Sequence, residues 1–145
     1  MTPTVIKRSF DNHQFNIPHL HVMNWYLEVL KKYAVFDGRA RRKEYWFFIL
    51  FNVLISMALG IIDRLTGNID PETGLGILSS LYPLGVMIPG IAVSVRRLHD
   101  TGRSGWWLLI NFVPVLGAIV FFFFMVIDSN PERNEYGPSP KSYEV

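Results

Sequence analysis

The chain of 145 residues contains no cysteine, so disulfide bonds, thiolate metal sites and cysteine nucleophiles are excluded. Charge is also missing from three long apolar segments, residues 45–62, 75–95 and 106–127. An α-helix needs about 20 apolar residues to cross about 30 Å of hydrocarbon, and an unpaired charge at that depth costs a few kcal/mol. The sequence therefore predicts an all-α integral membrane protein with three transmembrane helices.

Catalytic and metal-binding motifs are also missing. The sequence has no His-Glu-x-x-His stretch, nucleophile elbow or phosphate-binding glycine loop. His19 and His21 supply two ligands, where a defined metal site needs three or four. The apolar segments carry no ionisable group for intramembrane proteolysis, a proton relay or ion-coupled transport. We therefore expect no enzymatic activity, no catalytic residues, no bound metal and no cofactor.

Basic residues alternate in density along the chain. Eight precede the first apolar segment, one lies in the first loop, three lie in the second loop, and two lie in the tail. The positive-inside rule then places the N-terminus and second loop in the cytoplasm, and the first loop and C-terminus outside it. These basic residues flank apolar segments and interfacial aromatics without any reading motif, so no nucleic-acid partner is expected.

Domain boundaries follow from the same pattern. Residues 1–22 are polar and lack the apolar core of a cleavable signal peptide, so we interpret them as a flexible N-terminal extension. The three-span membrane domain covers residues 23–141, and residues 142–145 form a short tail. Apolar and aromatic side chains recur at helical spacing in residues 24–36, between Asn24 as a predicted cap and Gly38 as a predicted end. This short amphipathic helix would either lie at the membrane interface or pack on the first span.

Prolines interrupt the second and third apolar segments. The second contains Pro83 and Pro89, and the third contains Asn111 and Pro114. A proline frees a carbonyl that must find another partner in lipid. Two interpretations stay open: kinked helices that pack closely, or broken helices that line a transport path.

The densest polar cluster lies between the second and third segments, at residues 96–105. Its arginines would either bind phosphate or another anion, because guanidinium groups fork onto phosphates, or only fix the orientation of the protein. The cluster lies on the same predicted side as residues 39–44. Glu44 and Asp37 are therefore candidates for ion pairs with Arg96, Arg97 or Arg103, which would latch the N-terminal helix to this loop.

Three stretches resemble one family. Residues 36–46 (FDGRARRKEYW), residues 95–107 (VRRLHDTGRSGWW) and residues 134–140 (NEYGPSP) resemble signatures of the bacterial domain-of-unknown-function 805 family. Glu135 departs from the arginine usual at that position. The resemblance implies a small integral protein of the bacterial inner membrane, and it implies no substrate.

The leading functional hypothesis is a non-enzymatic interaction or adaptor protein. Its partners would be anionic lipid headgroups or another membrane protein, or a second copy of the chain. The candidate binding residues are Arg39, Arg42, Arg96, Arg97, His99, Asp100 and Arg103, in which Asp100 would orient the arginines or His99. An alternative is a subunit of an oligomeric transporter or channel, with Pro83, Pro89, Asn111 and Pro114 along the path. A weaker alternative is a lipid-modifying enzyme that uses His99 and Asp100.

Overall fold

The computed structural model describes the backbone of residues 18–142, and side chains from Met23 onward. This part of the chain is all-helical. Its elements are α1 (Pro18–Lys31), α2 (Arg42–Thr66), α3 (Ile77–Asp100), the 3₁₀ helix η1 (Gly105–Phe112) and α4 (Leu116–Val126). The predicted flexible extension covers residues 1–22. Residues 1–17 and all side chains before Met23 lie outside the described part, so that prediction is not tested there. Residues 143–145 also lie outside it.

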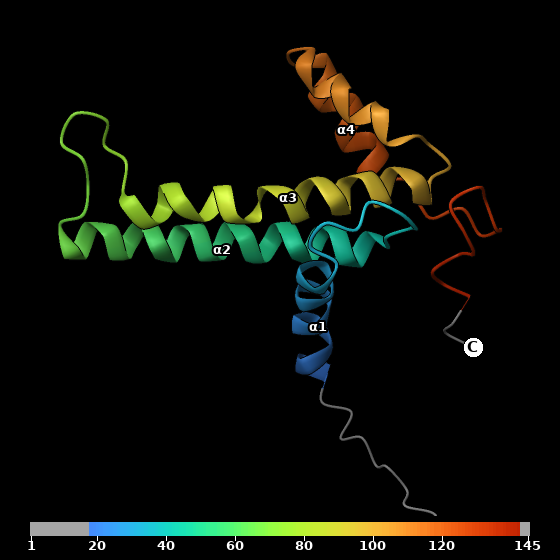
Figure 1. The fold of residues 1–145 in the computed structure, drawn as a ribbon, viewed down its shortest axis with the longest axis horizontal. Coiled ribbons are helices and arrows are strands. Elements are labelled where there is room, and N and C mark those ends of the chain that lie inside the picture. The colour runs from blue at the N-terminus through green and yellow to red at the C-terminus, as the bar shows by residue number, and fades with distance from the viewer. Residues whose placement is uncertain (1–17, 143–145) are drawn as a thin grey trace, which may run out of the picture.

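Helices α2 and α3 form a long antiparallel pair (Figure 1). Their 25 and 24 residues correspond to about 36 Å each, which is enough to cross a membrane. Only 11% and 22% of the residues in their most apolar stretches are buried. Core helices of a soluble protein would be mostly buried, so this exposed apolar surface is typical of helices that face lipid. The first two predicted spans therefore correspond to α2 and α3.

Asp63 joins the two helices at the end far from the termini. Its buried carboxylate accepts hydrogen bonds from the backbone N–H of Leu78 and from the N–H and hydroxyl of Ser79, at 2.9–3.2 Å. These donors belong to the first turn of α3, where backbone N–H groups have no partner within the helix. Gly76 permits the approach, because a Cβ there would lie 2.1 Å from Asp63 Oδ2.

The predicted third span is not one transmembrane helix. Residues 106–127 divide into η1 and α4, which pack against each other, and a Cβ on Gly117 of α4 would lie 1.8 Å from the Ile110 carbonyl oxygen of η1. Pro114 lies in the break, followed by Val115 with φ 61°. Each arm is about 16 Å long, roughly half the thickness of the hydrocarbon. The segment is a helical hairpin, and it returns to the end of α3 from which it started.

The hairpin changes the predicted position of the tail. Asn130 N–H donates to the Asp100 carbonyl at 3.1 Å, and Arg39 donates to the Glu132 carbonyl at 2.8 Å. The tail therefore lies beside the N-terminal basic segment and the end of α3. The expectation of a tail on the opposite side of the membrane from these segments counts 106–127 as a crossing, and the hairpin removes that premise.

Helix α1 packs against α2 with its C-terminal part and projects away from the α2–α3 pair at a steep angle (Figure 1). It begins at Pro18 and ends at Lys31, so the predicted cap at Asn24 and the end near Gly38 are wrong. Tyr26 stacks on Phe48 and contacts Phe51, with ring centroids 5.6 and 5.4 Å apart. The helix thus packs on the first span, which is one of the two interpretations open from the sequence.

Two tyrosines supply polar contacts to the spans. Pro89 has no N–H for the Gly85 carbonyl four residues earlier, and the Tyr33 hydroxyl donates to that carbonyl instead, at 2.5 Å. Tyr82 donates to Asn52 Oδ1 at 2.7 Å and lies 3.1 Å from the Tyr26 hydroxyl. The proline positions predict that a freed carbonyl needs a partner, but no sequence pattern identifies Tyr33 as its donor.

Candidate functional site

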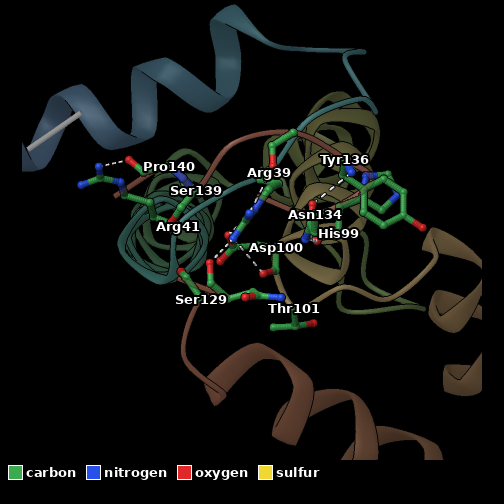
Figure 2. A network of polar contacts seen from close by, with 12 residues as sticks. Arg39, Arg41, His99, Asp100, Thr101, Ser129, Asn134, Tyr136, Ser139 and Pro140 are labelled. Carbon is green, nitrogen blue, oxygen red and sulfur yellow. Dashed lines mark hydrogen bonds and ion pairs between the residues drawn. The ribbon is translucent and has the colours of Figure 1, made fainter. Parts of the chain in front are cut away.

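The polar residues of the protein concentrate where α2 begins and where α3 and α4 end. Figure 2 shows part of this region, in which the tail passes over the end of α3. Asp100 is at its centre and is fully buried. Its carboxylate accepts hydrogen bonds from Arg39 Nε at 3.0 Å and from Arg97 Nη1 at 2.5 Å. One carboxylate thus joins two guanidinium groups that are at most 2% exposed.

Arg39 attaches the tail to this centre. Besides Asp100, it donates to the carbonyl oxygens of Asn130 at 2.5 Å, Glu132 at 2.8 Å and Gly137 at 3.3 Å. These carbonyls belong to an irregular segment outside helices and sheets, in which the Gly137 carbonyl also accepts the Asn134 N–H at 3.1 Å. Arg39 therefore replaces secondary structure as the partner of the tail backbone (Figure 2).

Arg97 performs a similar role for α4. It donates to the carbonyls of Met125, at 3.3 Å, and of Ile127. Trp46 Nε1 also donates to Met125, and Arg42 donates to Val126, both at 3.3 Å. The last carbonyls of a helix have no intrahelical donor, so these side chains complete the end of the hairpin.

Glu44 and Arg96 form a third buried ion pair, at 2.9 Å, with side chains 5% and 1% exposed. The predicted ion pair of Glu44 with Arg96 is confirmed, but it joins α2 to α3 and does not latch the N-terminal helix to a loop, because both residues lie within those two helices. The backbone supports it, because Ala40 N–H donates to the Arg96 carbonyl at 3.0 Å. The other predicted acid, Asp37, is exposed.

His99 belongs to the contact with the tail. Its Nδ1 lies 3.2 Å from the Gly38 carbonyl, and its ring stacks on Tyr136 with centroids 3.8 Å apart. Asn134 Nδ2 donates to the His99 carbonyl at 2.8 Å. Asp100 contacts the two arginines as predicted. Within residues 23–142 no hydrogen bond joins it to His99, so the catalytic pairing lacks its geometry.

The candidate residues therefore fall into two groups. Arg39, Arg96, Arg97 and Asp100 are buried and bonded within the protein, whereas Arg42 is exposed and pairs with Asp128 at 3.0 Å. Arg103 is half-buried, and its guanidinium carbon lies 4.3 Å from the centroid of the Phe124 ring. Lys43, which the sequence analysis did not select, is exposed beside Arg42.

The residues of the transporter alternative do not converge in the described chain. Pro89 is buried in α3, whereas Pro83 is exposed on the same helix. Asn111 and Pro114 are exposed on the hairpin, and the Asn111 amide donates to the Leu108 carbonyl at 2.9 Å. The transporter alternative needs a path between protomers, so for a single chain it stays a prediction.

Two of the concave surfaces that adjoin the polar region carry more than one basic side chain. A cleft of about 630 Å³ lies between α1, residues 35–41 and residues 136–140 of the tail. A groove of about 380 Å³ lies between α2 and the end of α4. The groove residues are Arg42, Lys43, Trp46, Phe47, Leu50 and Val126. Four of these are apolar or aromatic, and two are basic.

The fold and this site define a class: a small helical membrane protein with a buried arginine–carboxylate network at one end. Residues 33–138 match the family described as "Protein of unknown function (DUF805)". The chain belongs to this family, which confirms the resemblance seen in its signature stretches.

Two relatives of the chain are named as inner membrane proteins. The chain is 46% identical to inner membrane protein YhaH of Escherichia coli over 119 residues, 82% of this chain and 98% of that protein. It is 44% identical to inner membrane protein YhaI of the same species, over 82% of this chain and 97% of YhaI. The uncharacterized protein YiiR of Escherichia coli is 34% identical over 54% of this chain and 49% of its own length. No solved structure matches significantly. The protein is an inner-membrane protein.

Proposed function

We propose that the protein is a non-enzymatic interaction protein that binds an anionic phospholipid in the α2–α4 groove. The observation that carries the proposal is the order of chemistry along this groove. Arg42 and Lys43 lie in the first turn of α2, and Trp46, Phe47 and Leu50 follow along the same helix. An anionic phospholipid has the same order, a charged phosphate followed by acyl chains.

The energetics favour this ligand. Each basic residue near an anionic membrane surface contributes about 1 kcal/mol of attraction, and an arginine can contact a phosphate through two N–H groups. Trp46 is of the residue type that anchors proteins at the headgroup level. Below it, the apolar side chains of the groove contact one acyl chain, which excludes competing polar ligands.

The exposed ion pair of Arg42 is compatible with exchange. Arg42 and Asp128 are 43% and 56% exposed, and exposed ion pairs contribute about 0–1 kcal/mol. A phosphate can therefore replace or share this partner at little cost. Arg39 and Arg97 already have buried internal partners, and Arg96 lies outside this groove, so the headgroup role in the groove moves to Arg42 and Lys43.

The basic end of α2 and α3 lies on the cytoplasmic side in this proposal. Lysine and arginine are dense in residues 39–43 and 96–103, and the loop between α2 and α3 contains few. With the tail returned to the same end, the C-terminus is also cytoplasmic.

Native mass spectrometry of the protein released from nanodiscs of bacterial inner-membrane lipids tests the proposal. The wild type should retain phosphatidylglycerol or cardiolipin, and the variant Arg42→Gln/Lys43→Gln should lose most of it. A matched pair of single variants controls for charge. Lys43→Gln removes one charge inside the groove and should retain less lipid, whereas Arg133→Gln removes one from the exposed tail and should retain as much as the wild type. Retention of a partner chain in place of lipid would favour a protein–protein role. Equal lipid retention in wild type and double variant would reject the groove.

A further inference from the structure

Arg96 has an unpaired donor beside the larger cleft. The side chain is 1% exposed and lines the cleft between α1 and the tail. Its Nη1 donates to Glu44 Oε1 at 2.9 Å, but its buried Nη2 has no hydrogen-bond partner within the described part of the chain. Buried polar groups in folded proteins nearly always have partners, so this nitrogen indicates a position for an acceptor.

A solvent-exposed ion pair lines the same cleft as Arg96. Glu28 and Lys32 of α1 line the same cleft, pair at 3.0 Å and are each 41% exposed. The pKa of Glu28 is lowered, first by the hydrogen bond from Lys32 and in smaller part by Arg96, so Glu28 lies within electrostatic range of that guanidinium. Exposed pairs of this kind rearrange easily because they contribute little stability. Their movement gives a ligand access to Arg96.

The charges of the cleft select the ligand. Its basic members Lys32, Arg39, Arg41 and Arg96 outnumber its acidic members Glu28, Asp37 and Glu44 by four to three. Buried Arg39 is already neutralised by Asp100, which leaves three basic and three acidic members, so the free Arg96 donor rather than a net charge attracts the ligand. Since Glu44 lies directly beside Arg96, a dianion would meet strong repulsion, and a single negative charge fits better.

We propose that this cleft binds a monoanionic oxyanion, a phosphodiester or a carboxylate, whose oxygen accepts a hydrogen bond from Arg96 Nη2. Trp25 forms part of the wall, with the Arg41 guanidinium 5.8 Å from its ring centroid. The site is separate from the α2–α4 groove. A phosphodiester reaches it from a lipid headgroup or from a soluble molecule, and a carboxylate reaches it from solution.

Thermal unfolding of the delipidated full chain in maltoside micelles tests the site, because a ligand that binds only the folded state raises the unfolding midpoint. The probes are glycerophosphoglycerol as a soluble phosphodiester, acetate as a carboxylate, and phosphatidylglycerol added to the micelles. Sodium chloride at equal ionic strength is the control. We expect a saturable rise in the midpoint with at least one probe and none with chloride.

Two variants report on Arg96 itself. Arg96→Lys keeps a charge for Glu44 but removes the second donor, so half-saturation should need about tenfold more probe. Glu44→Gln keeps an acceptor for Nη1 and removes the repelling charge, so half-saturation should need about tenfold less probe. Lys43→Gln in the other groove should leave both soluble-probe responses unchanged.

The outcomes separate the sources and the two proposals. A response to a soluble probe assigns a soluble ligand. A response to phosphatidylglycerol alone assigns a lipid headgroup to the cleft, provided that it persists in an Arg42→Gln/Lys43→Gln background that removes the groove and is weakened there by Arg96→Lys. The proposal is overturned if no probe acts beyond chloride, or if Arg96→Lys responds as the wild type does. Should Arg96→Lys fail to fold, an unchanged half-saturating concentration in Glu44→Gln overturns it.

Discussion

Asp100 should be the most sensitive single carboxylate for stability. Its side chain is 0% exposed and pairs with Arg39 and Arg97, which are themselves buried. Asp100→Ala leaves two guanidinium groups without their counter-charge. Removal of one partner from a buried ion pair costs about 3–5 kcal/mol, mostly because the remaining charge stays desolvated. We therefore predict a loss of about 3–5 kcal/mol in the free energy of unfolding.

Asp128→Ala is the matched control. Asp128 also has two basic partners, Arg42 at 3.0 Å and Lys141 at 2.6 Å, but its side chain is 56% exposed. Exposed pairs contribute about 0–1 kcal/mol, so this variant should lose little. The two variants thus remove the same chemical group with the same number of ion pairs, and they differ in burial.

The assay is equilibrium unfolding in maltoside micelles by titration with dodecyl sulfate, followed by circular dichroism. Limited trypsin digestion gives a second readout, because Arg39 holds the tail that contains Arg133. Trypsin should cleave the Asp100→Ala variant faster than the wild type at Arg133, and it should cleave the Asp128→Ala variant at the wild-type rate. A loss for Asp100→Ala within about 1 kcal/mol of the control would refute the argument that burial makes this network stabilising.

Three further predictions follow from other contacts. A fluorescent protein fused to the C-terminus should report the same side of the membrane as one fused to the N-terminus; opposite sides would contradict the hairpin. Tyr33→Phe should cost about 1–2 kcal/mol in unfolding free energy by removing the donor to Gly85, and less when combined with Pro89→Ala, which restores a backbone N–H; additive losses in this double-mutant cycle would contradict the pairing. The pKa of Asp128 is lowered, mainly by the hydrogen bond from Lys141, so its contribution is present above the ordinary aspartate pKa and is lost as the pH falls through the lowered value. Asp128→Asn should remove that acid dependence, which amounts to less than about 1 kcal/mol in the free energy of unfolding measured as a function of pH. An unchanged pH profile in the variant would contradict the contact with Lys141.

The amino-acid sequence by itself determined the membrane class and the first two spans. Residues 45–62 lie within α2, and residues 75–95 largely coincide with α3, because apolar length is a local property that one segment reveals alone. The sequence also named Glu44 and Arg96 among the candidate partners at one membrane face, and the structure selected this pair from two acids and three arginines.

Only the tertiary structure decided the third apolar segment and the place of the tail. Residues 106–127 have the length and composition of a span, and Pro114 alone does not distinguish a kink from a reversal. The reversal depends on contacts with distant parts of the chain: Gly117 against Ile110, and Arg97 and Trp46 on the carbonyls at the end of α4. The count of basic residues assigned the tail to the opposite side of the membrane because it treated residues 106–127 as a crossing. The tail is held by Arg39 through backbone carbonyls, which carry no charge that a sequence pattern can show.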